Sequence, residues 1–151
     1  MLQKSVPGIL ILTSALVWAG GLSIFVGHPS ASPEPAASGA LLLVQLQGCG
    51  NPADAKVRAT ATAKDAPGAP RTLSLQVIPL NKPETVVVRG DEVKRGEWTV
   101  TITADHLGYE WSATVPMKDG DFNRKEIRQA RRPLSQSTRL SLPGGATPAV
   151  H

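Results

Sequence analysis

Apolar residues recur at every second position in short runs between Ala40 and Met117, and this period of two most constrains the fold. The clearest runs are residues 98–104 and 109–117, which are separated by a turn at 105–108. Such alternation is typical of a strand that has one face in a core and the other in water. We therefore predict a β-hairpin here, with Trp98 and Trp111 as anchors of the core.

Residues 56–63 and 73–77 alternate in the same way. Residues 40–47 form an apolar run that fits a buried strand, residues 84–89 offer a short strand, and turn residues lie between these segments. No long amphipathic helical period is present. These features favour an all-β fold, an immunoglobulin-like antiparallel β-sandwich of about seven strands over residues 40–142. A small barrel is the alternative. Residues 138–142 are expected to add a last strand, and residues 143–151 to form a flexible tail.

The sequence before residue 40 has a different character. Lys4 precedes an uncharged stretch of 21 residues, Val6 to Val26, which as a helix would be about 31 Å long, close to the thickness of a bilayer core. We predict that residues 1–27 form an N-terminal hydrophobic helix, and that residues 28–39, rich in Pro, Ala and Ser, form a solvated linker. The flanking charges orient the following domain toward the periplasm or the exterior.

This helix has two alternative fates. If it is retained, it is a single-span membrane anchor with the C-terminal domain outside. If it is a signal peptide, it is removed after Val17-Trp18-Ala19. Cleavage at that site would leave the apolar residues 22–26 exposed at the new terminus, which favours retention.

The segment 124–132 is a local anomaly in charge, with five cations and one carboxylate. Its cations are candidates for binding an anionic surface, such as lipid head groups or an acidic polysaccharide: Arg124, Lys125, Arg128, Arg131 and Arg132. The alternative is a polar edge strand or a solvated helical turn, in which lysines and arginines discourage edge-to-edge aggregation. Nucleic acid is not an expected partner, because the segment has no interleaved aromatic residue for base stacking.

His106 and Met117 are weak candidates for a metal site of the kind that holds copper in small exported domains. Their spacing is not that of a ligand pair, so no metal and no other cofactor is predicted. Cys49 follows Leu46-Gln47-Gly48 in the outline of a lipoprotein processing box, and the alternative is a structural thiol. The sequence has no nucleophile elbow, phosphate-binding loop or zinc helix, and we do not expect an enzyme.

Three short segments follow one another along the chain: Gly48-Cys49-Gly50-Asn51-Pro52, Ala59-Thr60-Ala61 and Gly96-Glu97-Trp98. In this arrangement the chain resembles an uncharacterised family of small exported bacterial β-sandwich proteins, with a Gly-Cys turn, a Thr/Ala strand and a Gly-x-Trp strand. The resemblance covers residues 41–133 and implies an exported sandwich without an assigned active site. The Gly-x-Trp strand behind an N-terminal span is also similar to accessory domains of copper handling and cytochrome-oxidase assembly.

Together these features predict a non-enzymatic binding or structural module at the bacterial cell envelope, either membrane-tethered or secreted. Its expected partners are the membrane, through the N-terminal helix, and an unknown envelope protein or anionic surface. The alternatives are an accessory domain for copper handling or respiratory-complex assembly, and an anionic-surface binder that uses segment 124–132.

Overall fold

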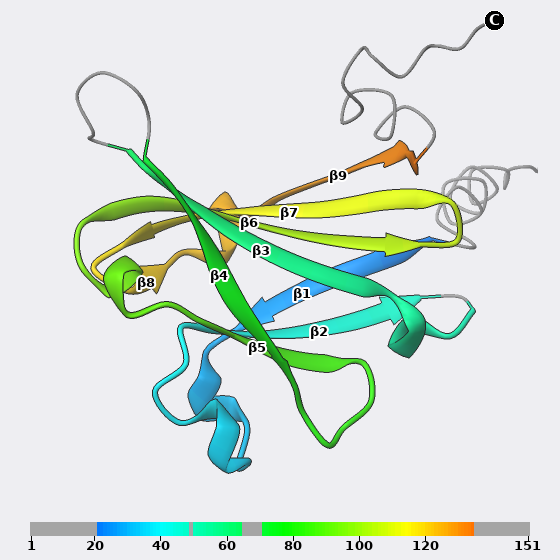
Figure 1. Ribbon diagram of the computed structural model, residues 1–151, viewed down its shortest axis with the longest axis horizontal. Coiled ribbons are helices and arrows are strands. Elements are labelled where there is room, and N and C mark those ends of the chain that lie inside the picture. Colours follow the sequence, from blue (N-terminus) through cyan, green and yellow to red (C-terminus); the bar gives the residue numbers. More distant parts are fainter. Residues whose placement is uncertain (1–20, 49, 65–70, 135–151) are drawn as a thin grey trace, which may run out of the picture.

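The computed structural model describes residues 21–48, 50–64 and 71–134, which form one sheet of nine antiparallel strands (Figure 1). The strands are β1 (Leu22–Gly27), β2 (Leu42–Gly48), β3 (Lys56–Ala63), β4 (Thr72–Pro79), β5 (Thr85–Arg89), β6 (Glu97–His106), β7 (Tyr109–Lys118), β8 (Asp121–Phe122) and β9 (Arg128–Pro133). Short 3₁₀ turns lie between them: η1 (Pro29–Ala31), η2 (Pro35–Ala37), η3 (Pro52–Asp54), η4 (Asp91–Lys94) and η5 (Arg124–Glu126). The predicted all-β, antiparallel class is confirmed, with nine strands rather than about seven.

The strand order is β1-β2-β5-β4-β3-β6-β7-β8, and β9 also pairs with β7. One strand, β4, belongs to both halves of the sheet, because residues 72–75 pair with β3 and residues 76–79 pair with β5. The sheet therefore curls round through β4, so that its two halves have the character of a sandwich but stay joined in one sheet (Figure 1). β1 ends the curl on one side, and β8 and β9, which share one edge of β7, end it on the other.

Aliphatic side chains from most strands fill the inside of the curl. They are supplied by alternating positions, chiefly Leu22, Ile24 and Val26 of β1, Leu42, Val44 and Leu46 of β2, Val100 and Ile102 of β6, and Ala113, Val115 and Met117 of β7. Burying one Leu, Ile or Val side chain contributes about 1.5–3 kcal/mol to folding. β1 supplies three of these side chains, so it is an integral part of the core.

β6 and β7 form the hairpin that the alternation predicts. Residues 97–106 pair with residues 109–118, and Trp98 and Trp111 are buried as expected. Leu107 and Gly108 form the two-residue turn, with φ angles of 51° and 82°. Two positive φ values in such a loop are those of a type I′ turn, whose twist matches that of the flanking strands.

The sequence predicted that residues 22–27 belong to a hydrophobic helix. In the structure they form strand β1. β1 pairs with residues 43–48 of β2 over its whole length. Phe25 is half exposed on the outer face, and this outward apolar residue hid the alternation of the inward ones. The predicted helix therefore does not include residues 22–27, and its boundary at residue 27 is wrong. Residues 1–20 lie outside the described residues, and an anchor or signal peptide in that part stays a prediction. Within the described residues, no helix has the length and apolar character needed to cross a membrane.

Residues 28–39 are not a solvated linker, because they run across the outer face of the sheet as η1 and η2. Ala37 is buried in a second apolar cluster with Leu80 and Val87. The guanidinium of Arg89 holds the segment in place by donating to the carbonyl oxygens of Ala36 and Ser38, at 2.9 and 3.0 Å. The composition suggested a spacer because the apolar partners of Ala37 are distant in sequence. Cys49, residues 138–142 and the predicted tail 143–151 lie outside the described residues.

Candidate functional site

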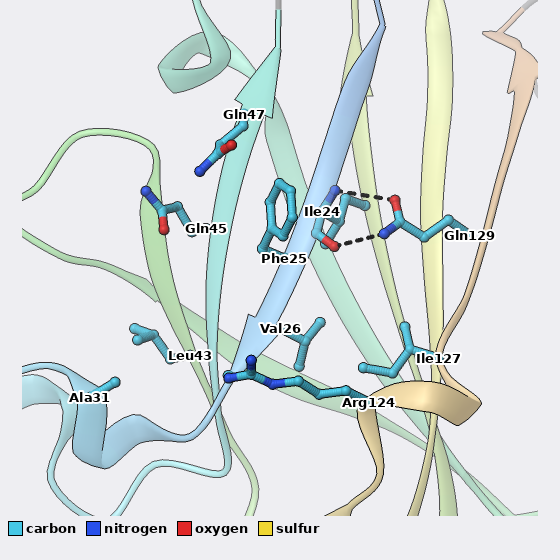
Figure 2. A pocket seen from close by; sticks show the side chains of 11 residues that line it. Ile24, Phe25, Val26, Ala31, Leu43, Gln45, Gln47, Arg124, Ile127 and Gln129 are labelled. Atoms are coloured by element: carbon cyan, nitrogen blue, oxygen red, sulfur yellow. Dashed lines mark hydrogen bonds between the residues drawn. The ribbon is translucent and has the colours of Figure 1, made fainter. Parts of the chain in front are cut away.

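β1 and β9 face each other where the curl of the sheet does not close. Gln129 of β9 bridges them with its carboxamide, whose Oε1 accepts from the Ile24 N–H at 3.2 Å and whose Nε2 donates to the Ile24 carbonyl oxygen at 3.0 Å (Figure 2). These two bonds are the pair that a residue of a neighbouring antiparallel strand would make. We call the gap between β1 and residues 124–131 the seam.

The bridge at Ile24 identifies which peptide groups of β1 face the seam. Alternate residues of an antiparallel pair turn their N–H and C=O groups toward the partner strand, and the others turn them away. Ile24 turns them away from β2, and its register partner Leu46 correspondingly donates its N–H to the Glu84 carbonyl oxygen, at 2.8 Å. Leu22 and Val26, two residues to either side of Ile24, therefore also present their peptide groups to the seam.

Gln129 divides the seam into two openings. The larger opening, of about 430 Å³, runs along β1 beside Arg124 and Ile127 and extends over Phe25 to the side chains of β2 (Figure 2). The smaller opening, of about 210 Å³, lies at the Leu22 end of β1, next to Trp111 and Arg131. Both openings border the same edge of β1, so the seam follows this strand along its length.

The larger opening has an apolar floor. Phe25 leaves 49% of its surface exposed there, and Val26, Leu43 and Ile127 line the same opening. Gln45 and Gln47 of β2 add carboxamide groups at one side (Figure 2). An exposed aromatic ring beside other apolar side chains is typical of a surface that binds a partner.

The charged residues that line the two openings are both arginines. Arg124 reaches across the end of β1 in the larger opening (Figure 2). In the smaller opening, the guanidinium of Arg131 lies over the rings of Tyr109 and Trp111, 5.1 and 5.4 Å from their centroids. Neither arginine forms an ion pair with any carboxylate of the described residues. The seam is therefore a positively charged groove.

The predicted basic segment 124–132 forms η5 and β9, so the alternative of a polar edge strand is confirmed. Successive residues of a strand lie on opposite faces, and β9 accordingly turns Gln129 and Arg131 to the seam but Arg128 and Arg132 outward. Lys125 is exposed on η5. The structure thus divides the five predicted cations between different surfaces, and binding of an anionic surface by all five stays a prediction.

Arg132 belongs to a cluster of ion pairs on the outer face of the sheet. Its Nε donates to Glu110 Oε1 at 2.8 Å, and Arg58 donates to Glu110 Oε2 at 3.1 Å and to Asp105 at 3.2 Å. Burial alone would raise the pKa of Glu110, but the hydrogen bonds from Arg132 and Arg58 and the attraction of their charges lower this pKa below its ordinary value. The cluster joins β3, β7 and β9, which is a structural role.

His106 and Met117 do not come together in a metal site. His106 pairs with Tyr109 next to the hairpin turn, whereas Met117 pairs with Trp98 at the other end of the hairpin, roughly 26 Å away at 3.3 Å per residue. Both side chains are buried. No group of three or more metal-ligating side chains occurs within residues 21–48, 50–64 and 71–134. The described structure therefore does not assemble the two copper ligands that the sequence suggested.

Of the two strands that border the seam, the sequence predicts β9 only as a polar edge strand and does not predict β1. Segment 127–131 shows no apolar alternation, because of the residues that face the seam only Ile127 is apolar, whereas Gln129 and Arg131 are polar. These two residues are polar because they lie at an open edge, so charge was the main signal that the sequence of this segment offered. For this reason the sequence did not identify Gln129 as a functional residue.

Comparisons of the chain with protein-family models, with curated proteins and with solved structures give no match. The resemblance to small exported bacterial proteins stays a prediction.

Proposed function

We propose that this protein is a non-enzymatic binding module of the bacterial cell envelope, and that it takes up an extended segment of a partner polypeptide along β1, in the seam. The observation that carries the proposal is the double hydrogen bond between the Gln129 carboxamide and Ile24. A side-chain amide at this place substitutes for the peptide group of a neighbouring strand. A docked segment would displace it and extend the same pattern of bonds.

The spacing of the peptide groups that face the seam supports an extended polypeptide as the ligand. Leu22, Ile24 and Val26 present their groups at intervals of two residues, about 6.7 Å, which is the repeat of a strand that would pair with them. Strand addition of this kind obtains its affinity from main-chain hydrogen bonds and its specificity from pockets for side chains. The openings of about 430 and 210 Å³ on either side of Gln129 would supply those pockets.

The chemistry of the lining supports binding without catalysis. Both openings are lined by aliphatic, aromatic, amide and guanidinium groups, with Ser23 as the one hydroxyl. The described lining contains no histidine, cysteine or carboxylate that could act as a general base or nucleophile. These residue types suit recognition of a peptide better than reaction with it.

Export is supported by the sequence that precedes β1. With residues 22–27 in the sheet, the remaining apolar run from Val6 to Ala19 has 14 residues, about 21 Å as a helix, and is shorter than a bilayer core of about 30 Å. It lies within the range of about 7–15 residues for the core of a signal peptide. Cleavage after Ala19 would leave residues 22–26 covered in the fold and not exposed. We therefore favour a secreted or periplasmic domain, and N-terminal sequencing of the native protein should begin at Gly20.

Peptide selection tests the binding function. A phage library of random short peptides is selected on the full chain, and the peptides obtained are resynthesised with N-methyl groups on either of the two sets of alternate residues. Strand pairing at one edge requires that one methylation pattern abolishes binding and the other retains it. Gln129→Ala should raise the affinity about fivefold, because it removes a competitor for Ile24 worth about 1 kcal/mol.

Gln76→Ala is the matched control, since Gln76 is an exposed glutamine on β4, away from the seam. It should leave the affinity unchanged. Failure to select any peptide, or equal binding of both N-methylated forms, contradicts the proposed function.

A further inference from the structure

Resting on the proposed function, we infer that the segment which the seam accepts is acidic at both ends and apolar between them. The seam would then select its partner by charge at Arg124 and Arg131 and by an apolar contact with Phe25. A peptide of this chemistry is a narrower ligand class than an extended polypeptide in general.

The charge of the partner follows from the two arginines. Each opening contains one guanidinium and no described carboxylate, so nothing in the seam neutralises the positive charge. By contrast, Arg58 and Arg132 on the outer face are already paired with Glu110. A partner carboxylate at each end of the seam would provide the missing counter-charge, with the geometry of a charge-assisted hydrogen bond.

The length of the partner follows from β1. The six residues of β1 extend over about 17 Å at 3.3 Å per residue. Arg131 lies in the opening at the Leu22 end, and Arg124 lies beside Gly27 at the other end. A segment as long as β1 would therefore place its terminal side chains next to the two arginines.

The apolar middle of the partner follows from Phe25. Its exposed ring lies between the two ends of the seam, and Leu43 and Ile127 line the same opening toward the Arg124 end (Figure 2). An apolar side chain of the partner would cover them and remove their apolar surface from water, which favours binding. A lipid surface is a weaker candidate, because the guanidinium of the exposed Arg131 lies over the rings of Tyr109 and Trp111 beside the smaller opening.

The test uses three capped synthetic peptides of one strand-forming sequence, which carry Glu, Gln or Lys at a position near each end. Their binding to the full chain is measured by fluorescence anisotropy. The Glu peptide should bind about tenfold more tightly than the Gln peptide, which corresponds to about 0.7 kcal/mol for each of two partly exposed charge pairs. The Lys peptide should bind most weakly.

Two double variants with the same change in net charge test whether Arg124 and Arg131 cause the preference for the Glu peptide. The preference for the Glu peptide should disappear in Arg124→Glu/Arg131→Glu and persist in Lys125→Glu/Arg128→Glu, whose side chains line neither opening. A cooperative urea transition in each variant checks that it is folded. Equal affinity for the Glu and Gln peptides overturns the acidic partner but leaves the proposed function intact.

Failure of all three peptides, together with failure of peptide selection, overturns the proposed function itself. Vesicles containing phosphatidylglycerol form the last arm of the test. Binding of the chain to these vesicles that is lost in Arg124→Glu/Arg131→Glu, without binding of the Glu peptide, assigns the two arginines to a lipid surface and overturns the inference.

Discussion

The side chain of Gln129 and the backbone of Ile24, which are 105 residues apart in sequence, hold the two ends of the curled sheet together. A single carboxamide makes both bonds, at 3.2 and 3.0 Å. β9 has no other neighbouring strand than β7 among the described residues. The Gln129 side chain therefore connects β9 to β1 across the seam, and it is also the group that a docking strand would replace.

Loss of the hydrogen bonds between Gln129 and Ile24 should lower the stability of the fold modestly and locally. Gln129→Ala should lower the free energy of unfolding by about 1 kcal/mol, the net worth of a partly exposed hydrogen bond. The Ile24 amide should exchange with solvent faster in the variant, as measured by hydrogen exchange. Gln76→Ala should change the unfolding free energy by less than about 0.5 kcal/mol. Equal effects of the two substitutions would show that Gln129 does not fasten the seam.

Two adjacent residues test the place of β1 in the core. Ile24→Ala should lower the free energy of unfolding by about 2–5 kcal/mol, because it empties space in a closely packed interior. Phe25→Ala, on the outer face of the same strand, should cost much less. Urea unfolding of the full chain measures both values. If residues 22–27 instead formed the end of a membrane helix, neither substitution would destabilise the β domain.

The ion pairs of Glu110 predict a dependence of stability on acid pH. Because the folded state lowers the pKa of Glu110, its ion pairs contribute fully above the ordinary glutamate pKa of about 4.3 and are lost as the pH falls toward the lower folded value. Glu110→Gln should therefore be less stable than the wild type at neutral pH and should lose less stability below about pH 4.3. Unfolding curves recorded across this range measure the difference.

The control for this prediction is Glu126→Gln, which changes an exposed carboxylate on η5. It should leave the stability at neutral pH within about 0.5 kcal/mol of the wild type. A Glu110→Gln variant that matched the wild type at neutral pH would contradict a stabilising role for the cluster.

The turn between β6 and β7 contains a residue, Leu107, whose replacement should stabilise the fold. Leu107 has a φ angle of 51°, in the left-handed region where a leucine is strained and asparagine is favoured. Leu107→Asn should raise the free energy of unfolding by about 0.5–1 kcal/mol, and the β-branched Leu107→Val should lower it. The midpoint of thermal unfolding would report both. A loss of stability in Leu107→Asn would show that the leucine side chain contributes packing that outweighs its backbone strain.

The parts of the fold that the sequence predicted are those in which each strand carries its own alternation. β3, β6 and β7 fall into this class, because their inward residues are apolar and their outward residues are largely threonine or charged. The hairpin turn also contains a local glycine signal at Gly108.

The parts that the sequence analysis missed depend on partners distant in the chain. β1 continues an uncharged run without a visible boundary, and only pairing with β2 shows that it is a strand. Ala37 is buried because Leu80 and Val87 lie beneath it. Gln129 has its role because the curl brings Ile24 within reach, and this contact across 105 residues has no local sequence signal.

Hydrogen exchange of β1 in the presence of a selected peptide tests the central claim most directly. With the peptide at saturation, the amides of Leu22 and Val26, which face the seam, should be protected at least tenfold more than without it. The amides of Ser23 and Phe25, which face β2, should keep their exchange rates. Unchanged protection of Leu22 and Val26 at saturation would contradict the docking of a strand in the seam.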